Sequence, residues 1–150
     1  MKNLVIFILC FLAFASSATA QEITVKLKAG KVMINEQHAF DYSYFNNRKE
    51  LYLYKIGTNQ DMVILQKIDK HVAEESENFF FIYFSDSKKS LQTKEYIKFP
   101  FQYILKKLVA EHAISQMGTV NDEPMEKFIN QYDEHLTNWL IPNENVNGYN

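Results

Sequence analysis

Hydrophobic and polar residues alternate along the first two thirds of the chain with the period of two that a β-strand produces. Ile23, Val25 and Leu27, for example, alternate with threonine and lysine. Such alternation places one set of side chains on each face of a strand. The pattern predicts short strands, joined by polar turns, over residues 23–27, 32–34, 39–45, 51–56, 62–68, 79–84 and 91–99.

One stretch between these strands lacks a clear period. Residues 69–78 are acidic and weakly patterned, and we expect a loop there or a single helical turn through residues 72–75. The acidic run at residues 74–77 is interpreted as part of a solvated loop.

The hydrophobic period changes at residue 100 from two to about 3.6. Phe101, Ile104, Leu105 and Leu108 form one stripe of a helix predicted to run to about residue 117, with Gly118 as its C-terminal cap. A second helix is predicted to begin at Asn121 or Asp122 and to end at Pro142. Its apolar stripe consists of Met125, Phe128, Ile129, Tyr132, Leu136 and Trp139.

These elements predict an α+β domain. Short connections between consecutive strands favour an antiparallel meander sheet of about six or seven strands. The two amphipathic helices, joined by four or five residues, are expected to form a C-terminal helical hairpin packed on one face of that sheet. We therefore divide the chain into a leader at 1–20, one domain at 21–142 and a flexible polar tail at 143–150.

The first twenty residues have the pattern of an export signal. Lys2 precedes an apolar run over residues 4–15, and Ala18-Thr19-Ala20 is the small-x-small pattern found before a cleavage site. We expect cleavage after Ala20 and a bacterial periplasmic or secreted location. The apolar run is too short to span a bilayer as a helix, so no membrane span is expected after cleavage.

Composition and charge narrow the classes of function. The chain has 16 basic and 18 acidic residues, and loss of Lys2 with the leader leaves 15 and 18, a net charge of −3. With no basic patch, nucleic acid is not an expected partner. The single cysteine, Cys10, lies within the leader, so no thiol chemistry and no disulfide are expected in the mature domain.

Two segments carry a resemblance to other proteins. The run Gly30-Lys31-Val32-Met33-Ile34-Asn35, followed by Phe40 and Tyr42, and the later run Lys127-Phe128-Ile129-Asn130-Gln131-Tyr132-Asp133-Glu134 resemble a family of small exported proteins of the Bacteroidota. The resemblance implies an exported domain with a strand-turn-strand opening and a C-terminal helix. It carries over no activity and no site residues.

A search for catalytic and metal-binding patterns finds none. The four histidines, at positions 38, 71, 112 and 135, lack the spacing of a zinc site, and no glycine-rich phosphate loop or Gly-x-Ser-x-Gly turn is present. We therefore expect a protein that is not an enzyme and that needs no metal or cofactor. His112 falls on the apolar stripe of the first predicted helix, and we interpret it as a structural polar anchor.

Aromatic residues occupy both faces of several predicted strands. Residues 79–84 are apolar on both faces, although one helical hairpin covers only one face of a sheet. The second face must be buried by sheet curvature, or covered by a protein partner, a second copy in a homodimer, or an apolar ligand. The candidate binding residues are Tyr42, Tyr44, Tyr52, Tyr54, Phe79, Phe81 and Tyr83.

The leading hypothesis is a non-catalytic binding or interaction protein of the cell envelope that uses these aromatic side chains. One alternative is a carrier that holds an apolar small molecule in a sheet–helix cavity lined by Phe79, Phe81, Tyr83 and Met62. A second alternative is a small hydrolase-like enzyme that pairs His112 or His135 with Asp133 or Glu111. Neighbouring members of these pairs are expected to point apart.

Overall fold

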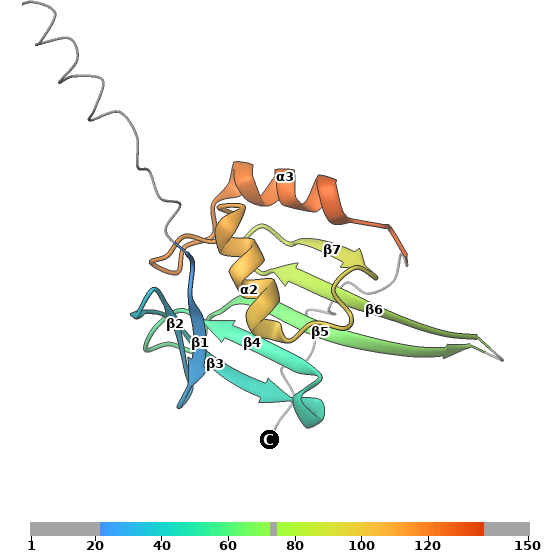
Figure 1. The fold of residues 1–150 in the computed structure, drawn as a ribbon, viewed down its shortest axis with the longest axis horizontal. Coiled ribbons are helices and arrows are strands. Elements are labelled where there is room, and N and C mark those ends of the chain that lie inside the picture. The colour runs from blue at the N-terminus through green and yellow to red at the C-terminus, as the bar shows by residue number, and fades with distance from the viewer. Residues whose placement is uncertain (1–21, 73–74, 137–150) are drawn as a thin grey trace, which may run out of the picture.

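The computed structural model describes residues 22–72 and 75–136, which form an antiparallel meander sheet followed by two helices (Figure 1). The seven strands lie side by side in the order in which they occur in the sequence. The predicted α+β fold is thereby confirmed. The strands are β1 (Val25–Lys28), β2 (Lys31–Ile34), β3 (Gln37–Phe45), β4 (Glu50–Tyr54), β5 (Asp61–Val72), β6 (Glu75–Phe84) and β7 (Lys89–Thr93).

The helices α2 (Phe101–Ala110) and α3 (Asp122–Tyr132) cover one face of the sheet. We call this the helix face and the opposite one the far face. Antiparallel register places directly opposed residues on the same face, so Leu51 and Leu53, which oppose Leu65 and Val63, share the helix face with them. All four side chains are fully buried.

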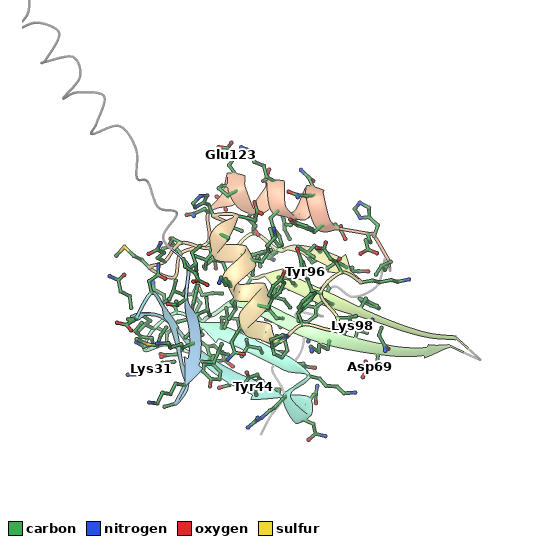
Figure 2. All side chains as sticks on the ribbon, in the orientation of Figure 1. Lys31, Tyr44, Asp69, Tyr96, Lys98 and Glu123 are labelled. Carbon is green, nitrogen blue, oxygen red and sulfur yellow. The ribbon has the colours of Figure 1, made fainter. Side chains whose placement is uncertain are left out.

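The apolar stripe of α2 supplies the second layer of the core. Ile104, Leu105 and Leu108 are buried against the sheet, and the ring of Phe101 meets that of Phe80 edge-on with centroids 5.5 Å apart. Tyr96 is also buried and lies close to α2 (Figure 2). Helix α3 adds Met125 and Phe128 to the same core, which joins the sheet to both helices.

The acidic segment after residue 68 is part of a long hairpin, so the predicted loop or helical turn is wrong. Strands β5 and β6 stay paired from Val63↔Phe84 as far as Asp69↔Asn78 and Val72↔Glu75. In contrast, β4 pairs with β5 only as far as Gln66, and β7 pairs with β6 only as far as Phe80. The end of the hairpin therefore projects beyond the other strands as a two-stranded ribbon (Figure 1). Backbone pairing between neighbours outweighs the weak side-chain pattern here.

The last strand is shorter than residues 91–99, because side chains of a distant segment end it. The Glu134 carboxylate accepts hydrogen bonds of 2.8 Å from the Thr93 hydroxyl and from the Lys94 N–H. The chain then turns, and the Phe99 N–H donates to the Tyr96 carbonyl at 3.0 Å.

Helix α2 ends at Ala110 instead of near residue 117, and the connection to α3 spans residues 111–121 instead of four or five residues. Within it, Ile114 and Val120 form an isolated β-bridge. Gly118 lies in this connection with φ = +80°, and a Cβ added there would lie 1.9 Å from the Ala39 carbonyl oxygen. Gly118 therefore permits contact with β3 and is not the cap of α2.

Helix α3 begins at Asp122 as predicted and ends at Tyr132, well before Pro142. It ends there because Asp133 adopts extended backbone and its carboxylate accepts a 2.9 Å hydrogen bond from the Gln92 N–H of β7. Trp139, Pro142, the leader, the tail and both proposed domain boundaries lie outside the described residues.

Candidate functional site: an acidic aromatic groove

The far face of β3 and β4 carries a row of aromatic rings. Phe45, Tyr52 and Tyr54 lie there because Phe45 opposes Glu50 and Tyr52 opposes Ser43 across the two strands. The rings of Phe45 and Tyr52 meet edge-on at 4.9 Å, and those of Tyr52 and Tyr54 are stacked at 6.5 Å. Phe45 is 47% exposed, and both tyrosines are half-buried.

These rings line an open groove of about 860 Å³. Its other walls come from the start of η1 (Asn46–Arg48) and from the turn that joins β4 to β5. The described lining residues are Asp41, Tyr42, Ser43, Phe45, Asn46, Glu50, Tyr52, Tyr54, Gly57, Thr58, Asn59 and Asp61. Three of them are acidic, and none of the described lining residues is basic.

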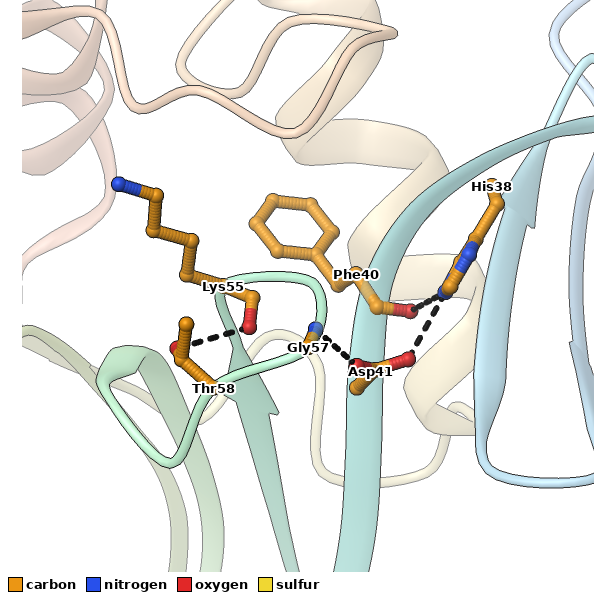
Figure 3. A network of polar contacts seen from close by, with 6 residues as sticks. All are labelled: His38, Phe40, Asp41, Lys55, Gly57 and Thr58. Carbon is orange, nitrogen blue, oxygen red and sulfur yellow. Dashed lines mark hydrogen bonds and ion pairs between the residues drawn. The ribbon is translucent and has the colours of Figure 1, made fainter.

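Asp41 fixes the wall of the groove by contacting both β3 and the β4–β5 turn (Figure 3). Its Oδ2 accepts a 2.7 Å hydrogen bond from the Gly57 N–H, and its Oδ1 lies 2.9 Å from the His38 Nε2. The same Nε2 lies 3.1 Å from the Phe40 carbonyl oxygen. Because both partners are acceptors, the His38 Nε2 carries hydrogen and donates to them.

The Gly57 N–H, followed by the interaction with His38, holds the pKa of Asp41 below its usual value. Asp41 is therefore an ionised and well-satisfied structural carboxylate at the edge of the groove.

Asp61 is the least satisfied of the three carboxylates. Asn46 donates a hydrogen bond to Glu50, and His38 and Gly57 contact Asp41, but no hydrogen bond or ion pair joins the Asp61 carboxylate to another residue in the described part of the chain. Asp61 is half-buried, and this burial raises its pKa. A cation in the groove would relieve this cost by stabilising the charged form.

The candidate tyrosines of β3 lie on the other side of the sheet. Tyr42 and Tyr44 oppose Leu53 and Leu51, so both side chains share the helix face. Their rings meet edge-on at 5.3 Å, and Tyr44 (labelled in Figure 2) lies 6.0 Å from the Phe101 ring of α2. Both are half-buried and pack against the core, so they lie on the opposite face of the sheet from Tyr52 and Tyr54.

The candidate residues of β6 do share the far face with Tyr52 and Tyr54. Tyr83 opposes Ile64, which in turn opposes Tyr52. Tyr83 is half-buried and stacks on Phe81 at 6.4 Å, whereas Phe79 and Phe81 are 0% and 1% exposed. These residues point away from the helices, so the structure does not join them with Met62 in a cavity between sheet and helices.

His112 does not lie on the apolar stripe of a helix, so the premise of the anchor hypothesis is wrong. It follows the end of α2, with φ = +61°, and its side chain is exposed. The polar contact at this position belongs to its backbone, because the His112 carbonyl accepts a 2.7 Å hydrogen bond from the Asn121 side-chain amide.

The prediction that the side chains of Asp133 and His135 point apart is also wrong. The His135 Nδ1 lies 2.8 Å from the Asp133 Oδ2, although the two side chains were expected to diverge. The helix ends before them, and His135 adopts a left-handed backbone with φ = +49°. The other Asp133 oxygen binds the Gln92 and His135 N–H groups at 2.9 and 3.1 Å, so this carboxylate holds the turn against β7.

Three further observations delimit the site. Within residues 22–72 and 75–136, no three histidine or acidic side chains cluster as a metal site would require. No helix in the same ranges has the length and apolar character needed to cross a bilayer. Comparisons of the chain with protein-family models, with curated proteins and with solved structures find no match.

Proposed function

We propose that this chain is a non-catalytic binding protein of the bacterial cell envelope and that it binds through the acidic aromatic groove. The observation that supports this proposal is the combination of three rings with three carboxylates, without a basic residue among the described lining residues. Its volume of about 860 Å³ lies within the range of small-ligand sites, roughly 300–1,000 Å³.

The chemistry of the lining selects the class of ligand. Tyr52 and Tyr54 offer ring faces to an apolar body or to a cation, and Asp61 offers a negative charge that has no partner among residues 22–72 and 75–136. We therefore expect a ligand or a partner side chain that combines a positive charge with an apolar portion. An anionic ligand would meet three carboxylates of the same sign.

The export part of the proposal rests on the sequence of residues 1–20 alone. Expression of the full chain in a bacterial host, followed by cell fractionation and mass spectrometry, should yield a periplasmic or secreted protein that begins at Gln21. Recovery of the uncleaved chain in the cytoplasm would contradict this part and leave the groove hypothesis open.

The binding part is tested with three matched probes. The ¹⁵N-labelled mature protein is titrated with phenethylammonium, with neutral 2-phenylethanol and with phenylacetate, while NMR follows each backbone amide. We expect saturable shifts with phenethylammonium at β3, β4 and the intervening turns, weaker shifts with the alcohol and none with phenylacetate.

Two variants and one control locate the contact. Tyr52→Ala should weaken binding about fivefold, since a cation–ring contact contributes roughly 1 kcal/mol, and Asp61→Asn should weaken it as well. Tyr103→Ala removes a 42% exposed ring from α2 and should leave binding unchanged. Equal binding of all three probes, or shifts confined to other surfaces, would contradict the proposal.

A further inference from the structure

The carboxylates of the acidic aromatic groove lie at its two ends and are not clustered. Glu50, Tyr52 and Tyr54 alternate along β4 and share the far face of the sheet. Asp41 and Asp61 are the cross-strand partners of Tyr54 in β3 and β5, so both lie at the Tyr54 end. Glu50 lies four positions from Tyr54 at the other end of the strand. Four positions of an antiparallel strand span roughly 13 Å.

An aromatic surface separates these two charged ends. The Tyr52 ring stacks on that of Tyr54 at 6.5 Å and meets that of Phe45 edge-on at 4.9 Å. Burial raises the pKa of Tyr52, and the negative charges of Glu50 and Asp61 raise it further. The Tyr52 ring therefore lies between carboxylates from both ends of the groove.

Neither end has a basic side chain that would neutralise it. Glu50 accepts a hydrogen bond from the Asn46 amide, and Asp41 accepts one from His38 (Figure 3). Among the described lysines and arginines, none forms an ion pair with these two carboxylates or with Asp61. Each end of the groove therefore keeps a negative charge that a ligand cation can neutralise.

A ligand that matches this arrangement has two separated positive charges and an apolar middle. Protonated polyamines have this form, because chains of methylene groups join their ammonium groups. One terminal ammonium can bind Glu50 and the other Asp61, while the methylene groups between them lie against the Tyr52 ring. An amine with a single charge can neutralise only one end of the groove.

We infer that the acidic aromatic groove binds linear aliphatic polyamines long enough to reach Glu50 and Asp61 at the same time. This inference rests on the proposed function and narrows its ligand class by requiring a second positive charge. Nine bonds join the terminal nitrogens of spermidine and of 1,8-diaminooctane, which separates them by roughly 11 Å in an extended chain. The shorter 1,4-diaminobutane cannot reach both ends.

A series of amines tests the two-ended site on the native mature protein. NMR follows the backbone amides at low salt and at about pH 7, where aliphatic amines are protonated. We expect spermidine and 1,8-diaminooctane to bind about fivefold more tightly than octylamine, because a second, partly exposed ion pair forms. They should exceed 1,4-diaminobutane by at least about the same factor, with shifts at β3, β4 and the adjoining turns.

Two variants separate the second charged end from the net charge of the protein. Glu50→Gln keeps an acceptor for the Asn46 amide and removes the charge. It should reduce the affinity for 1,8-diaminooctane to that for octylamine and leave phenethylammonium binding unchanged. Glu123→Gln removes an exposed carboxylate from α3 and is the matched control, which should change neither affinity. If Glu50→Gln unfolds, the amine series on the native protein still decides.

The outcomes distinguish this inference from the proposed function. Equal affinities for octylamine and 1,8-diaminooctane, with shifts at the groove, would overturn the polyamine inference and leave the proposed function intact. Equal losses of diamine affinity in Glu50→Gln and Glu123→Gln would also overturn it, because attraction to the net negative charge would then explain the binding. If phenethylammonium and all the other amines fail to bind, both the proposed function and this inference are contradicted.

Discussion

Asp41 shows how one carboxylate can stabilise a groove by joining segments that are distant in the sequence. It accepts hydrogen bonds from the Gly57 N–H and from His38, and these contacts hold its pKa below the usual value of 3.8. A carboxyl group whose pKa is lower in the folded state than in the unfolded state stabilises the fold. This stabilisation is fully present above the unfolded-state pKa, and it is lost as the pH falls through the folded-state pKa.

Replacing Asp41 with Asn should therefore lower stability in a pH-dependent way. We expect a loss of roughly 1 kcal/mol at neutral pH, because the carboxylate is partly exposed and its hydrogen bonds are screened. The difference from the native chain should shrink below about pH 4, where the native carboxylate becomes protonated. Urea unfolding at about pH 7 and about pH 3 measures this, and an equal difference at both values would contradict the expectation.

Gly118 marks a close approach between backbone segments. Its φ of +80° is unfavourable for other residues, and an added Cβ would lie 1.9 Å from the Ala39 carbonyl oxygen. Gly118→Ala should cost roughly 2 kcal/mol or more in the free energy of unfolding. Gly57→Ala is the matched control, because Gly57 has φ = +70° with nothing within 4 Å of the added Cβ. Similar losses in the two variants would show that the contact with β3 is unimportant.

At the scale of single elements, the β5–β6 hairpin has two parts with different support. Val63–Leu65 lie between β4 and β6, whereas Asp69–Val72 pair with β6 alone. An isolated two-stranded ribbon is only marginally stable in water, since it lacks further strands and a covering layer.

Hydrogen exchange should separate the two parts of the hairpin. Amides of Ile68–Val72 and Glu75–Asn78 should exchange much faster than those of Val63–Leu65, because local opening of the ribbon leaves the core intact. Exchange followed by NMR on the mature chain gives the rate of each residue. Uniform protection along both strands would indicate that the ribbon is supported by contacts beyond its own pairing.

At the scale of the whole molecule, one hydrophobic core joins the sheet to both helices. Leu108 is fully buried in it from α2, and Gln102 is exposed on the same helix. A core shared in this way should make unfolding cooperative, so that helix and sheet are lost together.

Leu108→Ala should therefore destabilise the entire fold by about 2–5 kcal/mol, because it leaves a cavity between α2 and the sheet. Near-UV and far-UV circular dichroism should report the same lowered midpoint in urea. Gln102→Ala should change the free energy of unfolding by less than about 0.5 kcal/mol. Separate transitions for the two signals would refute a single cooperative core.

The far face of the whole sheet combines two surfaces of different chemistry. Over β3 and β4 it carries rings and carboxylates, and over β5 to β7 it carries buried Phe79 and Phe81. Candidate residues taken from the sequence fell on both halves, while Tyr42 and Tyr44 fell on the helix face. Asp41, Glu50 and Asp61 were not among the candidates, because only strand register brings their carboxylates beside Tyr52 and Tyr54.

The sequence by itself determined the approximate positions of the seven strands and the two helices, and which side of α2 becomes core. The alternation of Ile23, Val25 and Leu27 and the stripe of Ile104, Leu105 and Leu108 are local patterns, and each one follows from the geometry of its own element. Only the tertiary structure decided the ends of α2, α3 and β7, the pairing of residues 69–72 with 75–78, and which tyrosines share a face with the Asp61 carboxylate. Those outcomes depend on hydrogen bonds and register between distant segments, such as Gln92 with Asp133, and no local period records them.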